Sequence, residues 1–327
     1  MKKEEREWAI LRTVYKENEF EWVTHQDVPD FELRHRGSTA EFGVEVTELY
    51  ETESHARARS HPTYIGNLLA GGPHMHKDDM KVFEVSKASI SDPDGNLKSG
   101  NVPAILRESP SQAEHSKAIA ELVRRKNDRA DEYLESLNHV NLIIMDWYEL
   151  GHAPTGEYST KDFLVPDLRS ALLEARFREI FLVMTQSDGR QVYRPLQMLL
   201  VLESYFLFIK ALQSFDSDEQ PCDLDDVVPL FVHTAREAGM SMELASSSEE
   251  GLTCAIHRGV GISQTPEGIR VLDFHDHDPP SAGPLTLPRL SVPGMAAFKR
   301  HHKDFVEANA FMTELAVDAV GAVARYE

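Results

Sequence analysis

Apolar and polar residues alternate along two short stretches near the start of the chain, on either side of a polar turn at residues 36–38. The apolar positions of the two stretches are Phe31, Leu33, Phe42, Val44 and Val46. A period of two is typical of a β-strand with one buried face, and a polar turn containing glycine joins two such strands. The pattern therefore predicts a β-hairpin over residues 28–50.

Further along the chain, apolar stripes at helical spacing predict helices, and continuous apolar runs predict strands that are covered on both faces. The predicted helices cover residues 2–18, 109–137, 167–177, 196–212 and 295–326, and the predicted strands cover residues 140–145, 178–186, 252–257, 259–262 and 269–274. The segment 196–212 is apolar nearly all round, so it is predicted to be buried. The order of the first elements is typical of an α/β fold with a mixed central sheet flanked by helices.

The 327 residues are enough for about two domains. We expect an α/β domain over residues 1–200, with an inserted loop region at about 51–110, and a C-terminal accessory region over 201–327 that is helical with short strands. The inserted region is rich in Gly, His and Pro, and shows little periodicity apart from a strand pattern at 80–87. An insertion of this kind is typical of a lid or a binding loop.

No stretch approaches the roughly 20 consecutive apolar residues that a membrane span requires. The basic residues at the start are not followed by the apolar segment of a secretory signal. Cys222 and Cys254 lack a metal-binding spacing, so we expect two reduced thiols. These features predict a soluble cytoplasmic protein without membrane contact.

Two carboxylates interrupt the predicted hairpin. Asp30 opens the first strand, and Glu45 lies inside the second, otherwise apolar strand. A charge inside an apolar strand is costly to bury unless it is paired or coordinates a metal. Carboxylates on adjacent strands can share one hard cation, so the pattern predicts a site for Mg²⁺, or for Mn²⁺ in its place.

Pro29-Asp30 and Glu45-Val46-Thr47 resemble the motif of the PD-(D/E)XK nucleases, the superfamily with the restriction-endonuclease-like fold. The resemblance covers the first 200 residues and departs from the motif at Thr47, where the motif has lysine. In a subset of the superfamily with E-V-T, the lysine is supplied from elsewhere in the fold. The resemblance implies that Asp30, Glu45 and the backbone carbonyl of Val46 bind the metal.

Lys126 lies on the apolar stripe of the predicted helix 109–137, seven residues before Tyr133. One interpretation is that its stem covers apolar surface while the amine reaches water. The other is that the amine points at the two carboxylates, and the resemblance favours it, because a helix lysine followed by such a tyrosine matches the E-V-T subset. For Glu7, beside the stripe of the first helix, we expect a solvated charge; in some members of the superfamily an acidic residue there joins the metal site.

The formal net charge of −20 opposes a simple nuclease, because binding of nucleic-acid phosphates normally requires a basic surface. A local basic groove, a groove completed by a second copy or a partner protein, and a substrate smaller than duplex DNA are the alternatives. The candidate substrate-binding residues come from the more basic first 130 residues and are Arg57, Arg59, Arg125 and Arg129.

Two histidine-rich segments are weaker metal candidates. The histidines are His55, His61, His74 and His76 in the inserted region and His275 and His277 in the Asp-rich segment 273–278. Because no further ligand cluster lies at a standard spacing, we expect solvated polar loops in both.

Together these features predict a metal-dependent nuclease that hydrolyses phosphodiester bonds of DNA or RNA. One alternative is a binding or scaffold protein that keeps the nuclease fold but has lost the chemistry, which Thr47 and the acidic composition favour. Another is a regulated effector, for instance in bacterial defence against phage, that is silent until a partner or small ligand reorganises the inserted region.

Overall fold

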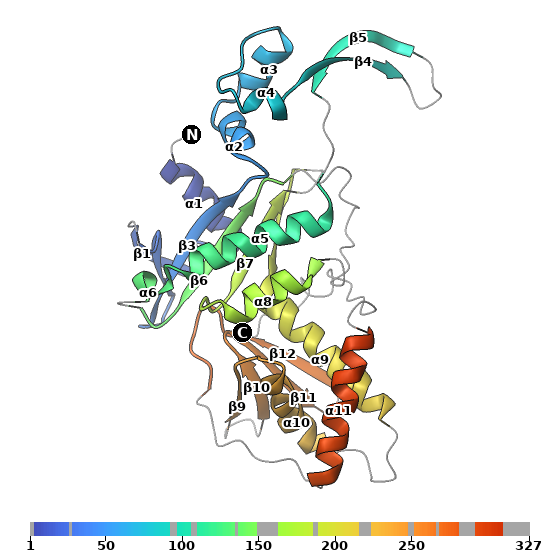
Figure 1. The fold of residues 1–327 in the computed structure, drawn as a ribbon. Coiled ribbons are helices and arrows are strands. Elements are labelled where there is room, and N and C mark those ends of the chain that lie inside the picture. Colours follow the sequence, from blue (N-terminus) through green and yellow to red (C-terminus); the bar gives the residue numbers. More distant parts are fainter. Residues whose placement is uncertain are drawn as a thin grey trace. The chain divides into compact units, whose positions relative to one another are not determined.

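The computed structural model describes residues 3–25, 28–91, 97–105, 110–134, 137–148, 163–185, 189–215, 224–247, 252–265, 268–280 and 292–309. The chain is mixed α/β and folds into two compact units (Figure 1). Unit 1 contains Met1–Leu49, Gln112–Asp146 and Pro154–Glu327, and unit 2 contains Tyr50–Ser111 and Trp147–Ala153. The predicted boundary near residue 200 is not one of these division points.

Unit 1 is built on a six-stranded sheet with the strand order β1-β2-β3-β6-β7-β8. Its strands are β1 (Phe20–His25), β2 (Phe31–His35), β3 (Glu41–Leu49), β6 (Val140–Asp146), β7 (Ile180–Thr185) and β8 (Gln191–Pro195). Strands β3, β6 and β7 are parallel, and the other pairs are antiparallel, so the sheet is mixed as predicted. The two edge strands, β1 and β8, were not predicted.

The predicted hairpin is confirmed. Strands β2 and β3 pair antiparallel, with Phe31 opposite Val44 and Leu33 opposite Phe42. Gly37 adopts φ +84°, a conformation that glycine reaches without a steric penalty, and so closes the turn. Strand β6 is buried along its whole length, which confirms a strand covered on both faces.

Helices cover both faces of the sheet. Helix α1 (Lys3–Val14) is followed by Tyr15, whose ring packs against Phe42 of β3, and α5 (Gln112–Asn127) reaches Glu45 on the same strand. Because adjacent strand residues alternate between faces, Phe42 and Glu45 face opposite sides. Helix α8 (Pro166–Glu174) packs beside α5.

The predicted helix 109–137 is wrong in its extent. The described helix begins at Gln112 and ends at Asn127, and the short helix α6 (Ala130–Tyr133) follows a turn. Ser109, the first residue of the predicted helix, lies outside the described residues.

The rest of unit 1 contains a second, antiparallel sheet in the order β12-β11-β10-β9. Its strands are β9 (Met242–Ser247), β10 (Leu252–His257), β11 (Val260–Thr265) and β12 (Gly268–Asp273), and the helices are α9 (Leu196–Ser214), α10 (Leu224–Glu237) and α11 (Val292–Asn309). Strand β9 and helix α10 were not predicted. Residues 310–326 of the predicted last helix, and Cys222, lie outside the described residues, whereas Cys254 is a buried free thiol.

Helix α9 confirms the predicted buried helix. In the described part of the chain it is the one helix that is long and apolar enough to cross a membrane by length and composition. Its apolar window is 67% buried inside the protein, as in the core helix of a folded domain.

Unit 2 corrects the prediction of an irregular loop over residues 51–110. It contains α2 (Glu53–Ser60), α3 (Tyr64–Leu69), α4 (Asp79–Val82) and a two-stranded ribbon of β4 (Val85–Ser91) and β5 (Leu97–Ile105). Helices of eight residues or fewer are too short to show a helical period, and for this reason the pattern missed them. The expected strand at 80–87 begins only at Val85, because α4 precedes it.

Candidate functional site

The register of the β2–β3 hairpin brings Asp30 and Glu45 together. Phe31, the first paired residue of β2, lies opposite Val44, so Asp30, which immediately precedes it, comes beside Glu45, the next residue of β3. The Glu45 charge acts on the Asp30 carboxyl and both residues line one pocket, so the two side chains lie close together. Both carboxylates are buried, with 6% of Asp30 and 4% of Glu45 exposed.

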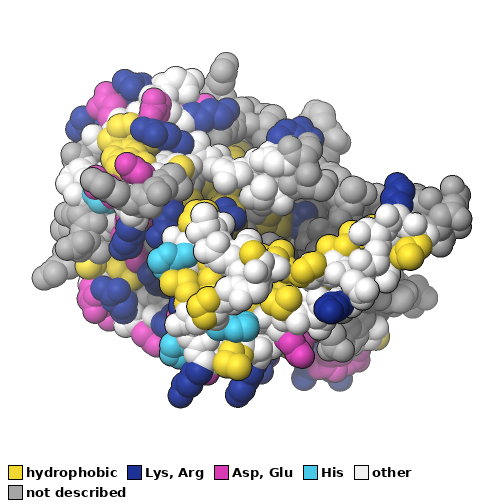
Figure 2. Space-filling model, turned by 90° about the horizontal axis from the view of Figure 1, so that it is seen from above, with side chains coloured by type: hydrophobic (Ala, Val, Ile, Leu, Met, Phe, Trp, Pro, Cys, Tyr) yellow, Lys and Arg dark blue, Asp and Glu magenta, His cyan; other side chains and the backbone are white. Residues whose placement is uncertain are grey.

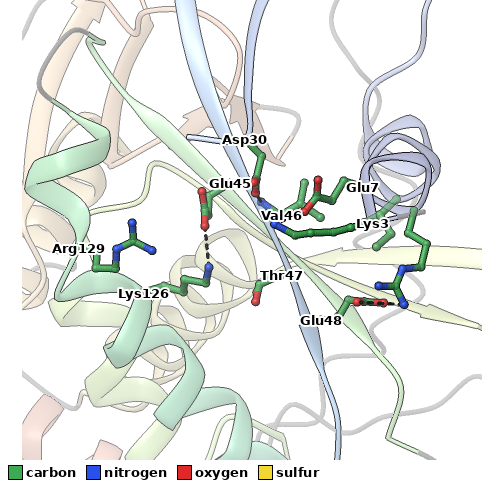
Figure 3. Close-up of a pocket in the computed structure, with 11 residues that line it drawn as sticks. Lys3, Glu7, Asp30, Glu45, Val46, Thr47, Glu48, Lys126 and Arg129 are labelled. Carbon is green, nitrogen blue, oxygen red and sulfur yellow. Dashed lines mark hydrogen bonds and ion pairs between the residues drawn. The ribbon is translucent and has the colours of Figure 1, made fainter. Parts of the chain in front are cut away.

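Each carboxylate has defined partners (Figure 3). The backbone N–H of Val46 donates to Asp30 Oδ2 at 2.8 Å. Lys126 Nζ donates to Glu45 Oε1 at 2.6 Å, and the Tyr133 hydroxyl donates to the same oxygen at 3.3 Å. Glu45 Oε2 is buried without a hydrogen-bond partner among the described residues.

The site disfavours two negative charges in the absence of a cation. Burial, and then the neighbouring Glu45 carboxylate, raises the pKa of Asp30 to about 7. Burial and the same carboxylate also raise the pKa of Tyr133, so its hydroxyl stays protonated and can donate to Glu45. Two crowded, desolvated carboxylates of this kind are the environment that a bound cation would stabilise.

Lys126 directs its amine at the Glu45 carboxylate, which agrees with the second of the two interpretations of its position on the helix. It lies one turn after the buried Leu122 of α5, and 17% of its side chain is exposed. Its amine ends on Glu45, and α6 then carries Tyr133 to the same carboxylate. The Lys126 ammonium group and the Tyr133 hydroxyl thus both lie beside the Glu45 carboxylate on β3.

The expectation that Glu7 is a solvated charge is wrong. Glu7 is 8% exposed and lies on the face of α1 that also buries Ile10 and Leu11. Its carboxylate pairs with Lys3 Nζ at 3.1 Å and lies 3.6 Å from His25 Nε2. The hydrogen bond to Glu7, with smaller contributions from the Asp30 and Glu45 charges, raises the pKa of Lys3.

These groups line one pocket of about 310 Å³. The lining residues are Lys3, Arg6, Glu7, Ile10, Asp30, Glu45, Val46, Thr47, Glu48, Lys126 and Arg129. Four cationic side chains face four carboxylates, so the pocket is balanced in charge although the chain carries −20. Lys3, Arg6 and Glu48 were not predicted as site residues. The available signal for Lys3 was the helical spacing that puts Lys3, Glu7 and Ile10 on one face of α1.

The structure separates the four candidate arginines. Arg129 lines the pocket, pairs with Glu132 at 2.8 Å and lies over the Tyr133 ring. Arg125 is exposed on α5 and does not line the pocket.

Arg57 and Arg59 both belong to unit 2. Arg57 pairs at 2.7 Å with Asp79, which is fully buried, and Arg59 stacks on the ring of Trp147. Burial opposes ionisation of Asp79, but hydrogen bonds from Arg57 and Tyr64 outweigh it and hold the pKa of this carboxyl below its ordinary value. The guanidinium of Arg57 therefore stabilises the fold of unit 2.

The other metal candidates do not converge. Among the described residues, no group of three or more His, Cys, Asp or Glu side chains is arranged to hold a metal ion. His275 pairs with Asp273 at 2.6 Å and is buried, so the expectation of a solvated loop is wrong there, and His277 pairs with Asp276 at 2.7 Å. Asp30 and Glu45 remain as the candidate ligand pair, and two carboxylates suit a hard cation that keeps several water ligands.

Comparison with protein-family models, with curated proteins and with solved structures finds no match for this chain. The geometry and charge of the pocket itself therefore carry the functional conclusion.

Proposed function

We propose that this protein is a metal-dependent nuclease of the PD-(D/E)XK type, which hydrolyses phosphodiester bonds of nucleic acid. The observation that supports the proposal is the meeting of three groups that are distant in the sequence. Asp30, Glu45 and Lys126 line one pocket, and Lys126 Nζ is 2.6 Å from Glu45 Oε1. The lysine that the motif lacks at Thr47 would then be supplied by α5.

The donor set fits Mg²⁺ or Mn²⁺. Asp30, Glu45 and the backbone carbonyl of Val46 would hold the ion, and all three offer the oxygen atoms that such hard cations prefer. Glu45 Oε2 is buried and without a partner in the described structure, and such an atom costs free energy until something binds it. When bound, the cation would polarise the scissile phosphate and lower the pKa of the attacking water.

The remaining groups of the pocket have roles that follow from their charges. Lys126 would orient the attacking water or stabilise the negative charge that develops on the phosphate. Tyr133, which donates to Glu45, would fix the orientation of that carboxylate. The cations Lys3, Arg6 and Arg129 would contact substrate phosphates, which gives an acidic chain a local site for a polyanion.

Hydrolysis of labelled duplex DNA, single-stranded DNA and single-stranded RNA tests the proposal. The native chain is expected to cleave at least one of them with Mg²⁺ or Mn²⁺ and none in EDTA. Glu45→Gln should reduce the rate by about 10³-fold, whereas the matched control Asp128→Asn, at an exposed carboxylate after α5, should keep it. Equal rates for the native chain and Glu45→Gln would contradict the proposal.

Calorimetry separates an active site from an inactive nuclease fold, the alternative that Thr47 and the acidic composition favour. An active site binds Mg²⁺ or Mn²⁺ through Glu45, so Glu45→Gln should weaken binding. An inactive fold would bind the ion with the same affinity in both chains or not at all.

A further inference from the structure

The ribbon of unit 2 extends beyond the core that anchors it. Its base is held where Ile105 of β5 packs against a small core of Tyr64, Leu68 and Phe83. Beyond this base the described side chains of both strands are exposed or half-buried. A two-stranded ribbon is marginally stable in water by itself, so an exposed one is a candidate for binding a partner.

The charge of the ribbon differs from that of the chain. Its described strands carry Lys87 and Lys98, both exposed, and no Asp or Glu. Residues 50–111 hold seven Lys and Arg against eight Asp and Glu, whereas the whole chain holds 34 against 54. In Figure 2, hydrophobic and uncharged side chains predominate along the ribbon and Lys or Arg side chains lie among them. The described strands of the ribbon therefore lack the excess of negative charge that the chain as a whole carries.

The other side chains of the ribbon match a nucleic-acid groove. Its uncharged hydrogen-bonding residues include Ser86, Ser89, Ser99 and Asn101. Ile90 is 49% exposed and Leu97 is 66% exposed, and they lie on neighbouring rungs, since Ile90 pairs with Ser99 and Leu97 pairs with Ser91. Architectural DNA-binding proteins insert apolar side chains of this kind between base steps.

We propose that the β4–β5 ribbon is an arm that binds in a groove of duplex DNA. Lys87 and Lys98 contact phosphates, and Ile90 and Leu97 pack against the bases. The inference rests on the proposed nuclease function and narrows its substrate to the duplex. A two-stranded ribbon has the width that the major groove admits, and apolar residues near its end also suit a widened minor groove.

Fluorescence anisotropy of a fluorescein-labelled 25-base-pair duplex tests the arm, with the full-length chain in EDTA so that binding is independent of hydrolysis. The variant K87E/K98E is compared with K210E/K303E, which changes the net charge equally at two exposed lysines of α9 and α11. The arm variant should bind at least about tenfold more weakly and lower the slope of log K against log salt by about 2. The control should bind within about twofold of the native chain.

A second variant, Ile90→Ser/Leu97→Ser, should weaken binding without changing the salt slope, because it removes no charge. Near-ultraviolet circular dichroism of each variant confirms that the mutated chain is folded. The arm is refuted if K87E/K98E and K210E/K303E weaken binding equally, or if the native chain does not bind the duplex. It is also refuted if light scattering shows that the arm variants turn a dimer into a monomer, because the ribbon would then join two copies.

Hydrolysis of bis(p-nitrophenyl) phosphate with Mn²⁺ separates the arm from the pocket. This small phosphodiester has no groove for the ribbon to contact. The variant K87E/K98E should therefore hydrolyse it at the native rate although the same variant binds duplex DNA weakly. Native hydrolysis together with unchanged duplex binding would refute the arm and leave the proposed nuclease function standing. Loss of hydrolysis in K87E/K98E would overturn the arm as a separate binding element.

Discussion

Replacing Asp30 with Asn is expected to stabilise the metal-free protein, and to do so more strongly at pH 8 than at pH 5. Burial and the Glu45 charge raise the pKa of Asp30 to about 7 in the folded chain, from an ordinary value of 3.8. Between these two values the folded state binds more protons than the unfolded state, so the stability of the native chain falls as the pH rises. Asparagine carries no charge and does not suffer this loss.

The magnitude follows from the pKa difference of about three units, at 1.36 kcal/mol for each unit. Asp30→Asn should raise the free energy of unfolding by up to about 4 kcal/mol at pH 8 and about 2 kcal/mol at pH 5. The amide oxygen of asparagine can still accept the N–H of Val46, so this hydrogen bond is kept.

Urea unfolding in EDTA at the two pH values, followed by tryptophan fluorescence, measures the effect. The control Asp128→Asn removes an exposed carboxylate and should change stability by less than about 0.5 kcal/mol at either pH. With Mg²⁺ added, the native chain should gain stability and Asp30→Asn should gain much less. A variant that is less stable than the native chain at pH 8 would refute the crowding of the two carboxylates.

Three further predictions concern Lys126, Asp30 and Glu179. Lys126→Met leaves the Glu45 carboxylate buried without its ammonium partner, so urea unfolding at pH 7 should show a free energy of unfolding lower by about 3 kcal/mol. Lys126→Arg keeps a positive charge and should lower it less. Equal losses in the two variants would contradict a stabilising Lys126–Glu45 ion pair. Calorimetry should show Mg²⁺ binding about tenfold weaker at pH 6 than at pH 8, because Asp30 must release a proton; an affinity independent of pH would exclude this competition. Glu179→Ala removes a buried carboxylate that accepts three backbone N–H groups, and thermal or urea unfolding should show a loss of about 3 kcal/mol or more, with smaller loss for Glu179→Gln.

The sequence by itself determined the elements whose pattern is local. Alternation on either side of Gly37 predicted β2 and β3, and their register then follows from the position of the turn. Asp30 precedes Phe31 and Glu45 follows Val44, the pair at the end of the hairpin, so the closeness of the two acids was already contained in the hairpin. The continuous apolar runs of β6 and β7 were readable for a similar reason, since a strand buried on both faces needs no polar positions.

The tertiary structure alone decided which partners the inward-facing groups meet. Periodicity showed that Lys126 lies on the inner stripe of its helix, but the packing of α5 against β3 selected Glu45 as its partner. Glu7 lines the pocket because α1 turns its Ile10 face to the sheet. Arg57 forms an ion pair with the buried Asp79 instead of lining the pocket. A sequence period fixes the direction of a side chain relative to its own element, whereas the contact it makes depends on where a second element packs.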